Sequence, residues 1–153
     1  MKNDTPFRAT FPAWVPDSVW VALGGILGTL SRHGTDVLLL PSQLAHPGFP
    51  WPTFLINVSG AALLGFVMAW IEESARPPNW LRPFAAIGFC GSFTTFSTAS
   101  VEILLLARDG HPAIALTYLA ASLVCGILAV TITTALGVRI FKGPGAAKGK
   151  LTA

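Results

Sequence analysis

Residues 88–98 read GFCGSFTTFST and form the middle of a long apolar run. A plain membrane-spanning helix would place leucine, isoleucine and valine there, whereas this segment gathers glycines, hydroxyls and aromatic rings. Such a run favours a break in the helix, and carbonyls freed by a break are tolerated at membrane depth only where protein buries them or where they bind something. The alternative is that the serine and threonine side chains only bond back to carbonyls four residues earlier. The segment therefore predicts a broken membrane helix with a polar site at the break.

The composition indicates an integral membrane protein. Hydrophobic residues make up 52% of the 153 residues and charged residues 11%, whereas soluble domains carry about 25% charged residues. A bilayer-spanning helix needs about 20 mostly apolar residues. Four such runs are present, at residues 19–40, 53–71, 81–106 and 113–138. The expected fold is therefore all-α, with four transmembrane helices of which the third is broken in mid-membrane.

The two ends of the chain are expected to lie outside this helical domain. Residues 1–18 are interpreted as an N-terminal tail, because early prolines argue against the apolar stretch of a cleaved signal peptide. Residues 19–140 form the transmembrane domain, and residues 141–153, which are rich in glycine, form a disordered tail. The sequence thus predicts one membrane domain with two short tails.

Enzymatic activity and nucleic-acid binding are not expected. No cluster of histidine, cysteine or carboxylate side chains has catalytic spacing on any helical face, so no catalytic residue is proposed. The net charge of +3 comes from lysines and arginines at the chain ends and in loops, a distribution that reflects membrane topology. We therefore expect the chain to be surrounded by membrane lipid and do not expect it to bind a nucleic acid.

Two polar residues inside the first two apolar runs carry information. Arg32 follows Gly24 and Gly28 at intervals of four residues, which indicates either a packing seam that ends in an Arg32–Asp36 pair or a cation that attracts anions. Asn57 lies in the middle of the second run, where a lone asparagine most often forms a hydrogen bond between helices.

A stripe of hydrogen-bond donors without a buried cation follows along the third and fourth runs. Cation paths typically contain carboxylate rings or carbonyl filters, and paths for large anions contain arginine or lysine rings. The positive ring edges of Phe93 and Phe96 suit a small anion. The residues therefore indicate a small-ion pathway, with an anion as one candidate, and they do not choose among the halides. The stripe consists of Thr95, Thr98, Glu102, Tyr118, Ser122 and Gly126.

The sequence resembles the Fluc (CrcB-type) fluoride channel family over nearly all of residues 20–140. The resemblance implies a four-helix subunit in the inner membrane and an antiparallel dimer with two narrow fluoride pores and a central structural sodium ion. The matching pieces are Gly24-Gly25-Ile26-Leu27-Gly28 followed by Arg32, then Asn57-Val58-Ser59-Gly60 with Gly65, and then residues 88–98 followed by Glu102.

The resemblance also implies roles for particular residues. The backbone carbonyls of Gly91 and Thr94 from both subunits would hold the sodium ion. Asn57 would donate to fluoride, and Phe96 would offer its ring edge. The polar track would be lined by Ser97, Thr98, Tyr118 and Ser122, with Arg32 in the vestibule and Glu102 in the same pore region.

Two features of the sequence leave the identity of the partner subunit undecided. Ala99 and Ala62 replace aromatic residues that are usual in the family, and His33 replaces a usual aromatic after the arginine. Eight lysines and arginines lie on the side of the N-terminus, the second loop and the C-terminus, against two on the other side. This bias favours one orientation in the membrane, so the dimer is either an antiparallel homodimer or a heterodimer with a related subunit of opposite orientation.

Two other classes of membrane protein are the alternatives. A small multidrug-type exporter with four spans needs a carboxylate in the middle of its first helix, and residues 22–30 contain none. A non-transporting membrane assembly protein would need only packing seams and would leave the polar segment 88–98 without a purpose. The expected function is passive fluoride export, which lowers the toxicity of fluoride in the cytoplasm.

Overall fold

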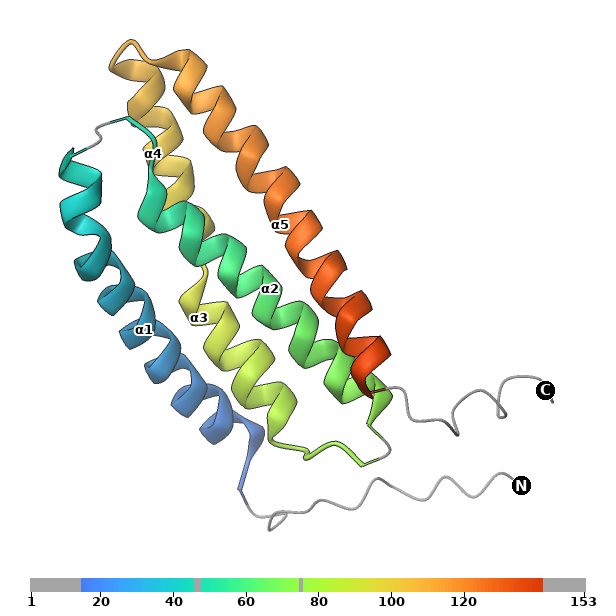
Figure 1. The fold of residues 1–153 in the computed structure, drawn as a ribbon. Coiled ribbons are helices and arrows are strands. Elements are labelled where there is room, and N and C mark those ends of the chain that lie inside the picture. The colour runs from blue at the N-terminus through green and yellow to red at the C-terminus, as the bar shows by residue number, and fades with distance from the viewer. Residues whose placement is uncertain (1–14, 46–47, 75, 142–153) are drawn as a thin grey trace.

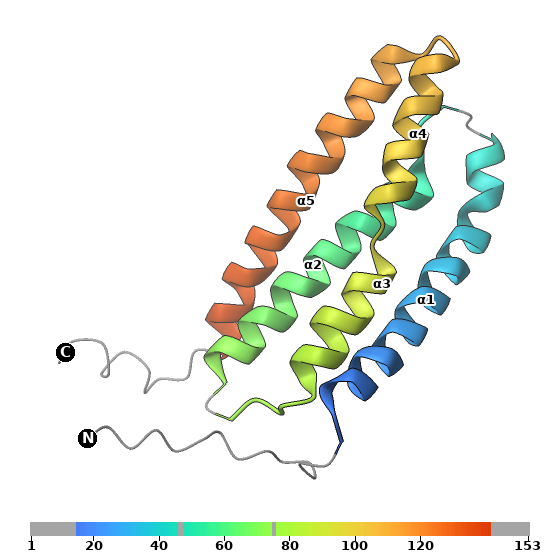
Figure 2. The same ribbon diagram turned by 180° about the vertical axis from the view of Figure 1, so that it is seen from behind.

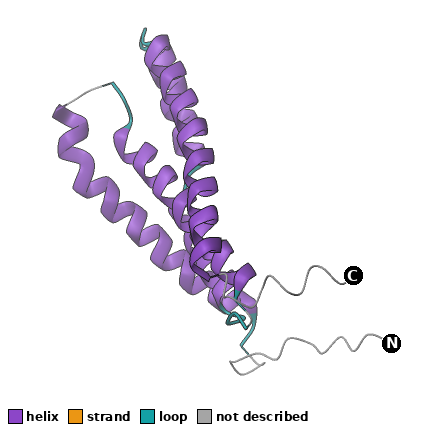
Figure 3. Cartoon of the chain, turned by 45° about the vertical axis from the view of Figure 1, so that its right-hand side comes forward, coloured by secondary structure: helices purple, strands orange, loops and turns teal. Residues whose placement is uncertain are grey.

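The computed structural model describes residues 15–45, 48–74 and 76–141, so residues 1–14 and 142–153 of the two expected tails fall outside the described residues. Within the described ranges every regular element is helical (Figure 3), which confirms the all-α prediction there. The elements are α1 (Asp17–Ala45), α2 (Trp51–Glu73), η1 (Arg82–Cys90), α3 (Gly91–Phe93), α4 (Phe96–Arg108) and α5 (Pro112–Phe141).

The helices lie side by side as a bundle (Figures 1 and 2). The chain runs in one direction through α1 and through the consecutive segments η1, α3 and α4, and in the opposite direction through α2 and α5. Three stretches are long and apolar enough to cross a membrane, namely α2, residues 82–108 and α5. This result supports an integral membrane protein. Helix α1 has 29 residues but is less apolar, because Arg32, His33 and Asp36 interrupt it.

Glycines set the distance between α1 and η1. A side chain on Gly24 or Gly28 would collide with the backbone carbonyl of Phe84 or Phe89, and one on Gly88 would collide with the backbone of α1. Close approach of membrane helices commonly depends on small residues at such positions. The packing seam predicted from Gly24 and Gly28 is therefore confirmed, and Gly88 is its counterpart on η1.

A second close contact joins α2 and α5 along their lengths. Gly65 lies against the hydroxyls of Thr133 and Thr134, and the Thr134 hydroxyl donates to the Gly65 carbonyl at 3.3 Å. Gly137 of α5 packs in turn against Ala69 of α2. The two halves of the bundle, α1 with η1 and α2 with α5, are thus each held by glycine contacts, and the candidate site lies where α1, α2 and α4 meet.

Two prolines lie where the helix ends differ from the expected bounds. Helix α1 continues through Pro41 to Ala45, although its span was expected to end at residue 40. Proline removes one donor to the preceding turn, and near a helix end the following turn can still form. Helix α2 begins two residues early, at Trp51, because Pro52 lies in its first turn, where a backbone N–H has no helical partner.

Candidate functional site

The helical path between Arg82 and Arg108 is interrupted at two threonines (Figure 1). Thr94 has φ −76° and ψ 155°, and Thr95 has φ −145° and ψ 119°, which is extended backbone at both positions. Helix α4 restarts at Phe96, and the Thr95 hydroxyl caps it by accepting from the backbone N–H of Thr98 at 3.2 Å. Before the interruption, Arg82–Cys90 is wound as a π-helix, a geometry that is common at functional sites.

Asn57 of α2 is paired with the backbone of Thr95. Its Oδ1 accepts from the Thr95 N–H at 2.8 Å, and its Nδ2 donates to the Thr95 carbonyl at 2.9 Å. An asparagine amide has two N–H donors, so one remains, and that donor has no partner among the described residues. The predicted hydrogen bond between helices is therefore confirmed, and the predicted donation to fluoride rests on the remaining N–H.

The interruption also leaves the carbonyls of Gly91 and Thr94 without their usual helical donors. The Thr95 N–H would reach the Gly91 carbonyl in a continuous helix, but here it donates to Asn57. The Thr98 N–H, four residues after Thr94, donates to the Thr95 hydroxyl. The Gly91 backbone is exposed, with open space beside its Cα. The carbonyls of Gly91 and Thr94 are thus two of those at the break that lack the N–H four residues on.

The hydroxyls of the segment fall into two groups. The Thr94 hydroxyl bonds back to the Cys90 carbonyl at 2.9 Å, as the alternative interpretation of the sequence expected. The Thr95 hydroxyl instead lies 2.9 Å from that of Thr98 and 3.3 Å from that of Ser97. These three hydroxyls form a local network at the start of α4, beside the extended backbone.

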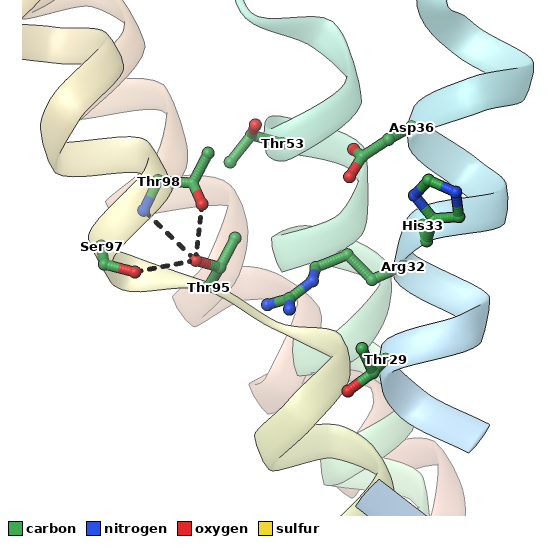
Figure 4. Close-up of a pocket in the computed structure, with 8 residues that line it drawn as sticks. All are labelled: Thr29, Arg32, His33, Asp36, Thr53, Thr95, Ser97 and Thr98. Atoms are coloured by element: carbon green, nitrogen blue, oxygen red, sulfur yellow. Dashed lines mark hydrogen bonds between the residues drawn. The ribbon is translucent and has the colours of Figure 1, made fainter. Parts of the chain in front are cut away.

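A polar cleft of about 480 Å³ opens between α1, α2 and α4 (Figure 4). The guanidinium group of Arg32 extends from α1 towards Thr95, and His33 and Asp36 lie further along α1. No ion pair of Arg32 occurs within residues 15–45, 48–74 and 76–141, so the Arg32–Asp36 pair of the packing alternative is not formed. The cleft is lined by Thr29, Arg32, His33, Asp36, Thr53, Thr95, Ser97 and Thr98.

Glu102 joins three helices next to this cleft. Its Oε1 accepts from the Thr53 hydroxyl at 2.7 Å, and its Oε2 accepts from the Tyr118 hydroxyl at 2.9 Å. Thr53 also lines the cleft, whereas Glu102 does not. Thr53 was missed from the sequence, although it precedes Asn57 by four residues and therefore shares its helical face.

The family follows from comparison with known proteins. Residues 19–134 match the sequence model of the family described as CrcB-like protein, Camphor Resistance (CrcB). The chain belongs to this family. The chain is 46% identical over 123 residues to fluoride-specific ion channel FluC 2 of Symbiobacterium thermophilum, covering 78% of this chain and 95% of that protein.

Other relatives carry the same description. The identity is 43% over 117 residues to fluoride-specific ion channel FluC of Saccharophagus degradans, covering 76% of this chain and 85% of the relative. The identity to fluoride-specific ion channel FluC of Deinococcus radiodurans is 39% over 131 residues, covering 86% of this chain and 99% of the relative. These matches confirm the family resemblance drawn from the sequence, and the relatives are named as ion channels, as expected for a chain that is not an enzyme.

Five residues predicted for the pathway of this CrcB-family chain, Asn57 among them, are not part of the cleft lining. Phe96 is 85% exposed on the surface of the subunit, and Phe93 is half-buried beside Gly60. Tyr118 is 0% exposed and faces Glu102, and the buried Ser122 hydroxyl has no hydrogen-bond partner among the described residues. The single subunit thus brings Arg32, Ser97 and Thr98 together around the break but does not form a continuous track.

Proposed function

We propose that this chain is a fluoride-specific ion channel of the inner membrane, which lets fluoride leave the cell passively and so lowers its toxicity in the cytoplasm. The proposal is supported by the relatives, which are named fluoride-specific ion channels and match most of the chain. The observation that carries it is the pairing of Asn57 with the backbone of Thr95, a residue that lines the polar cleft, which leaves one Asn57 amide N–H without a partner among the described residues.

The donors at the break suit a small anion. Fluoride is compact and strongly hydrated, so a pathway must replace its water with closely spaced donors. The hydroxyls of Ser97 and Thr98 and the free N–H of Asn57 offer such donors, and all are neutral. Arg32 and Asp36 both line the cleft, and the Arg32 guanidinium extends towards Thr95, so its positive charge draws anions towards these donors.

The fourth span of the proposed channel is α1, and the break between α3 and α4 lies in mid-membrane. Its 29 residues give α1 a length of about 43 Å at ~1.5 Å per residue, more than the ~30 Å of a hydrocarbon core. Arg32 and Asp36 line the cleft, so these charges need not face lipid.

The channel is proposed to be an antiparallel dimer, either of two copies or with a related subunit. Gly91 is exposed on the single subunit, and lipid cannot satisfy its backbone groups at membrane depth. A second subunit over this face would cover them, together with the exposed ring of Phe96. Phe93 on the same segment would then lie close to the covered face, as its predicted role in the pathway requires.

A structural sodium ion is proposed at the centre of this dimer. The carbonyl oxygens of Gly91 and Thr94 lack the helical donors they would have in a continuous helix, which makes them available as ligands. Two such oxygens from each subunit make four neutral oxygen ligands. Oxygen donors suit hard cations, and the absence of a carboxylate among these four suits a single positive charge.

Growth in fluoride tests the proposed function in cells. A bacterial strain that lacks its own fluoride exporter should grow at elevated fluoride when it expresses this chain, and an Asn57→Asp variant expressed at the same level should not support growth. Equal sensitivity of cells with the chain and cells with an empty vector, at verified membrane expression, would contradict the proposal. Equal protection by the Asn57→Asp variant would show that Asn57 is not part of the fluoride pathway.

A further inference from the structure

An aromatic residue of the loop between α1 and α2 lies against Tyr118. The ring centroids of Phe49 and Tyr118 are 5.3 Å apart, and the rings meet edge to face at 78°. Gly48 precedes Phe49 with φ +140°, a backbone conformation that favours glycine, and the Phe49 carbonyl accepts from the Trp51 N–H at 2.9 Å. The backbone on both sides of Phe49 therefore fixes the point from which its side chain extends.

Tyr118 has little freedom apart from this contact and its hydrogen bond. Its side chain is 0% exposed, and its hydroxyl donates to Oε2 of Glu102 while Thr53 donates to Oε1. An edge-to-face contact favours a particular angle between two rings, so Phe49 contributes to the orientation of the Tyr118 ring. With both oxygens of Glu102 occupied by donors, the carboxylate stays outside the lining of the cleft.

We propose that Phe49 is a positioning residue for the Thr53–Glu102–Tyr118 network, and that it thereby keeps the negative charge of Glu102 out of the fluoride path. The inference rests on the proposed fluoride channel function for its effect on flux. Without the Phe49 ring, Tyr118 can turn away from Glu102. The carboxylate then has one free oxygen, which can rotate past Thr53 into the cleft, where it would add to the negative charge of Asp36 and repel an entering anion.

Tyr118 is the single tyrosine of the chain, so its ring can be observed without assignment. Protein labelled with ¹³C at the tyrosine Cζ carbon gives one NMR signal that reports the hydrogen bond of the hydroxyl. The variant Phe49→Leu, which keeps apolar volume but removes the ring, is expected to shift this signal in the same direction as Glu102→Gln. The matched control is Phe54→Leu. The ring centroids of Phe54 and Phe49 are 5.4 Å apart, but Phe54 makes no ring contact with Tyr118 in the described structure.

Two NMR results would overturn the inference. The first is an unchanged Tyr118 signal in Phe49→Leu, and the second is an equal shift in Phe54→Leu. Phe49→Trp, which retains an aromatic ring, should restore a signal close to that of the unsubstituted protein. Size-exclusion profiles of all the variants establish that the assembly is intact, and the NMR readout does not depend on transport.

Fluoride efflux from liposomes supplies the functional readout. Phe49→Leu and Tyr118→Phe are each expected to lower the efflux rate roughly five- to tenfold, and the double variant is expected to be no slower than the slower single variant, because both changes act through one network. Multiplied losses in the double variant would show that Phe49 acts independently and would contradict the inference. A failure of the unsubstituted protein to conduct fluoride would contradict the proposed function, whereas the NMR comparison would still decide whether Phe49 positions Tyr118.

Discussion

Asn57 and Thr95 exchange two hydrogen bonds, of 2.8 and 2.9 Å, so that one side-chain amide replaces the helical partners of a complete backbone unit. Buried backbone groups need partners, and at the mid-membrane position proposed for the break lipid could not supply them. The pair therefore stabilises extended backbone at the point where η1 and α3 give way to α4. It also orients the remaining Asn57 N–H. The same side chain thus stabilises the break and holds the donor that is proposed to bind fluoride.

Replacing Asn57 by aspartate should separate these two contributions. An ionised carboxylate can still accept from the Thr95 N–H, but it leaves the Thr95 carbonyl without its donor and places a negative charge in an anion path. We expect fluoride efflux to be lost and stability to fall by about 1–3 kcal/mol. Ser59→Ala is the control, since among the described residues the Ser59 hydroxyl bonds within its own helix α2, to the Ile56 carbonyl at 3.2 Å. An assembled Asn57→Asp protein with full flux would show that Asn57 is only a packing residue.

The seam between α1 and η1 can be tested with two glycines of the same helix. A side chain on Gly28 would collide with the Phe89 carbonyl, whereas Gly34 has open space around it. Gly28→Ala should therefore destabilise the protein by about 1–3 kcal/mol through overpacking, and Gly34→Ala should leave stability equal or slightly higher. Thermal unfolding in detergent, followed by size exclusion, measures both. Equal melting temperatures for the two variants would argue against a close contact at Gly28.

The proposed sodium site predicts an ion-dependent stability. A cation held by the carbonyls of Gly91 and Thr94 binds the folded assembly and not the unfolded chain, so it stabilises by mass action. The melting temperature should rise with sodium concentration at constant ionic strength, with N-methylglucamine as the replacing cation. The same melting temperature and the same flux in both salts would contradict the proposed sodium site.

The charge distribution predicts how the chain inserts. Eight lysines and arginines on one side against two on the other favour copies with both ends in the cytoplasm. A single cysteine near the C-terminus, in a variant with Cys90 and Cys125 replaced, should be labelled mainly from the cytoplasmic side. If it is labelled equally from both sides and the chain purified alone conducts well, the assembly is a dual-topology homodimer and Ala99 is a tolerated substitution.

The sequence predicted the residues of the break better than their partners. Glycines and hydroxyls in a membrane-length run drew attention to residues 88–98, and the extended backbone at Thr94 and Thr95 falls inside that segment. Asn57 was expected to bond between helices, because a lone amide in an apolar run needs a partner. Its specific partner depends on the rotation of α2 about its own axis, which hydropathy does not determine.

Long-range contacts account for what the sequence did not predict. Glu102 receives a hydrogen bond from Thr53, 49 residues earlier, and neither residue has a local pattern that predicts the pair. Phe96 was expected in the pathway, yet it is 85% exposed on the single subunit, because the face on which it lies is completed only by another chain in the proposed assembly. Residue type thus indicated which side chains matter, whereas helix rotation and assembly determine what they contact.

The most direct test of the fluoride channel is efflux from liposomes that contain the purified chain, loaded with equal concentrations of fluoride and chloride. A potassium ionophore balances the charge, and two ion-selective electrodes follow the release of both anions. We expect rapid release of fluoride with essentially no chloride, because neutral donors in a narrow path replace the hydration shell of the smaller anion. Comparable release of chloride, or retention of fluoride by assembled protein, would contradict it.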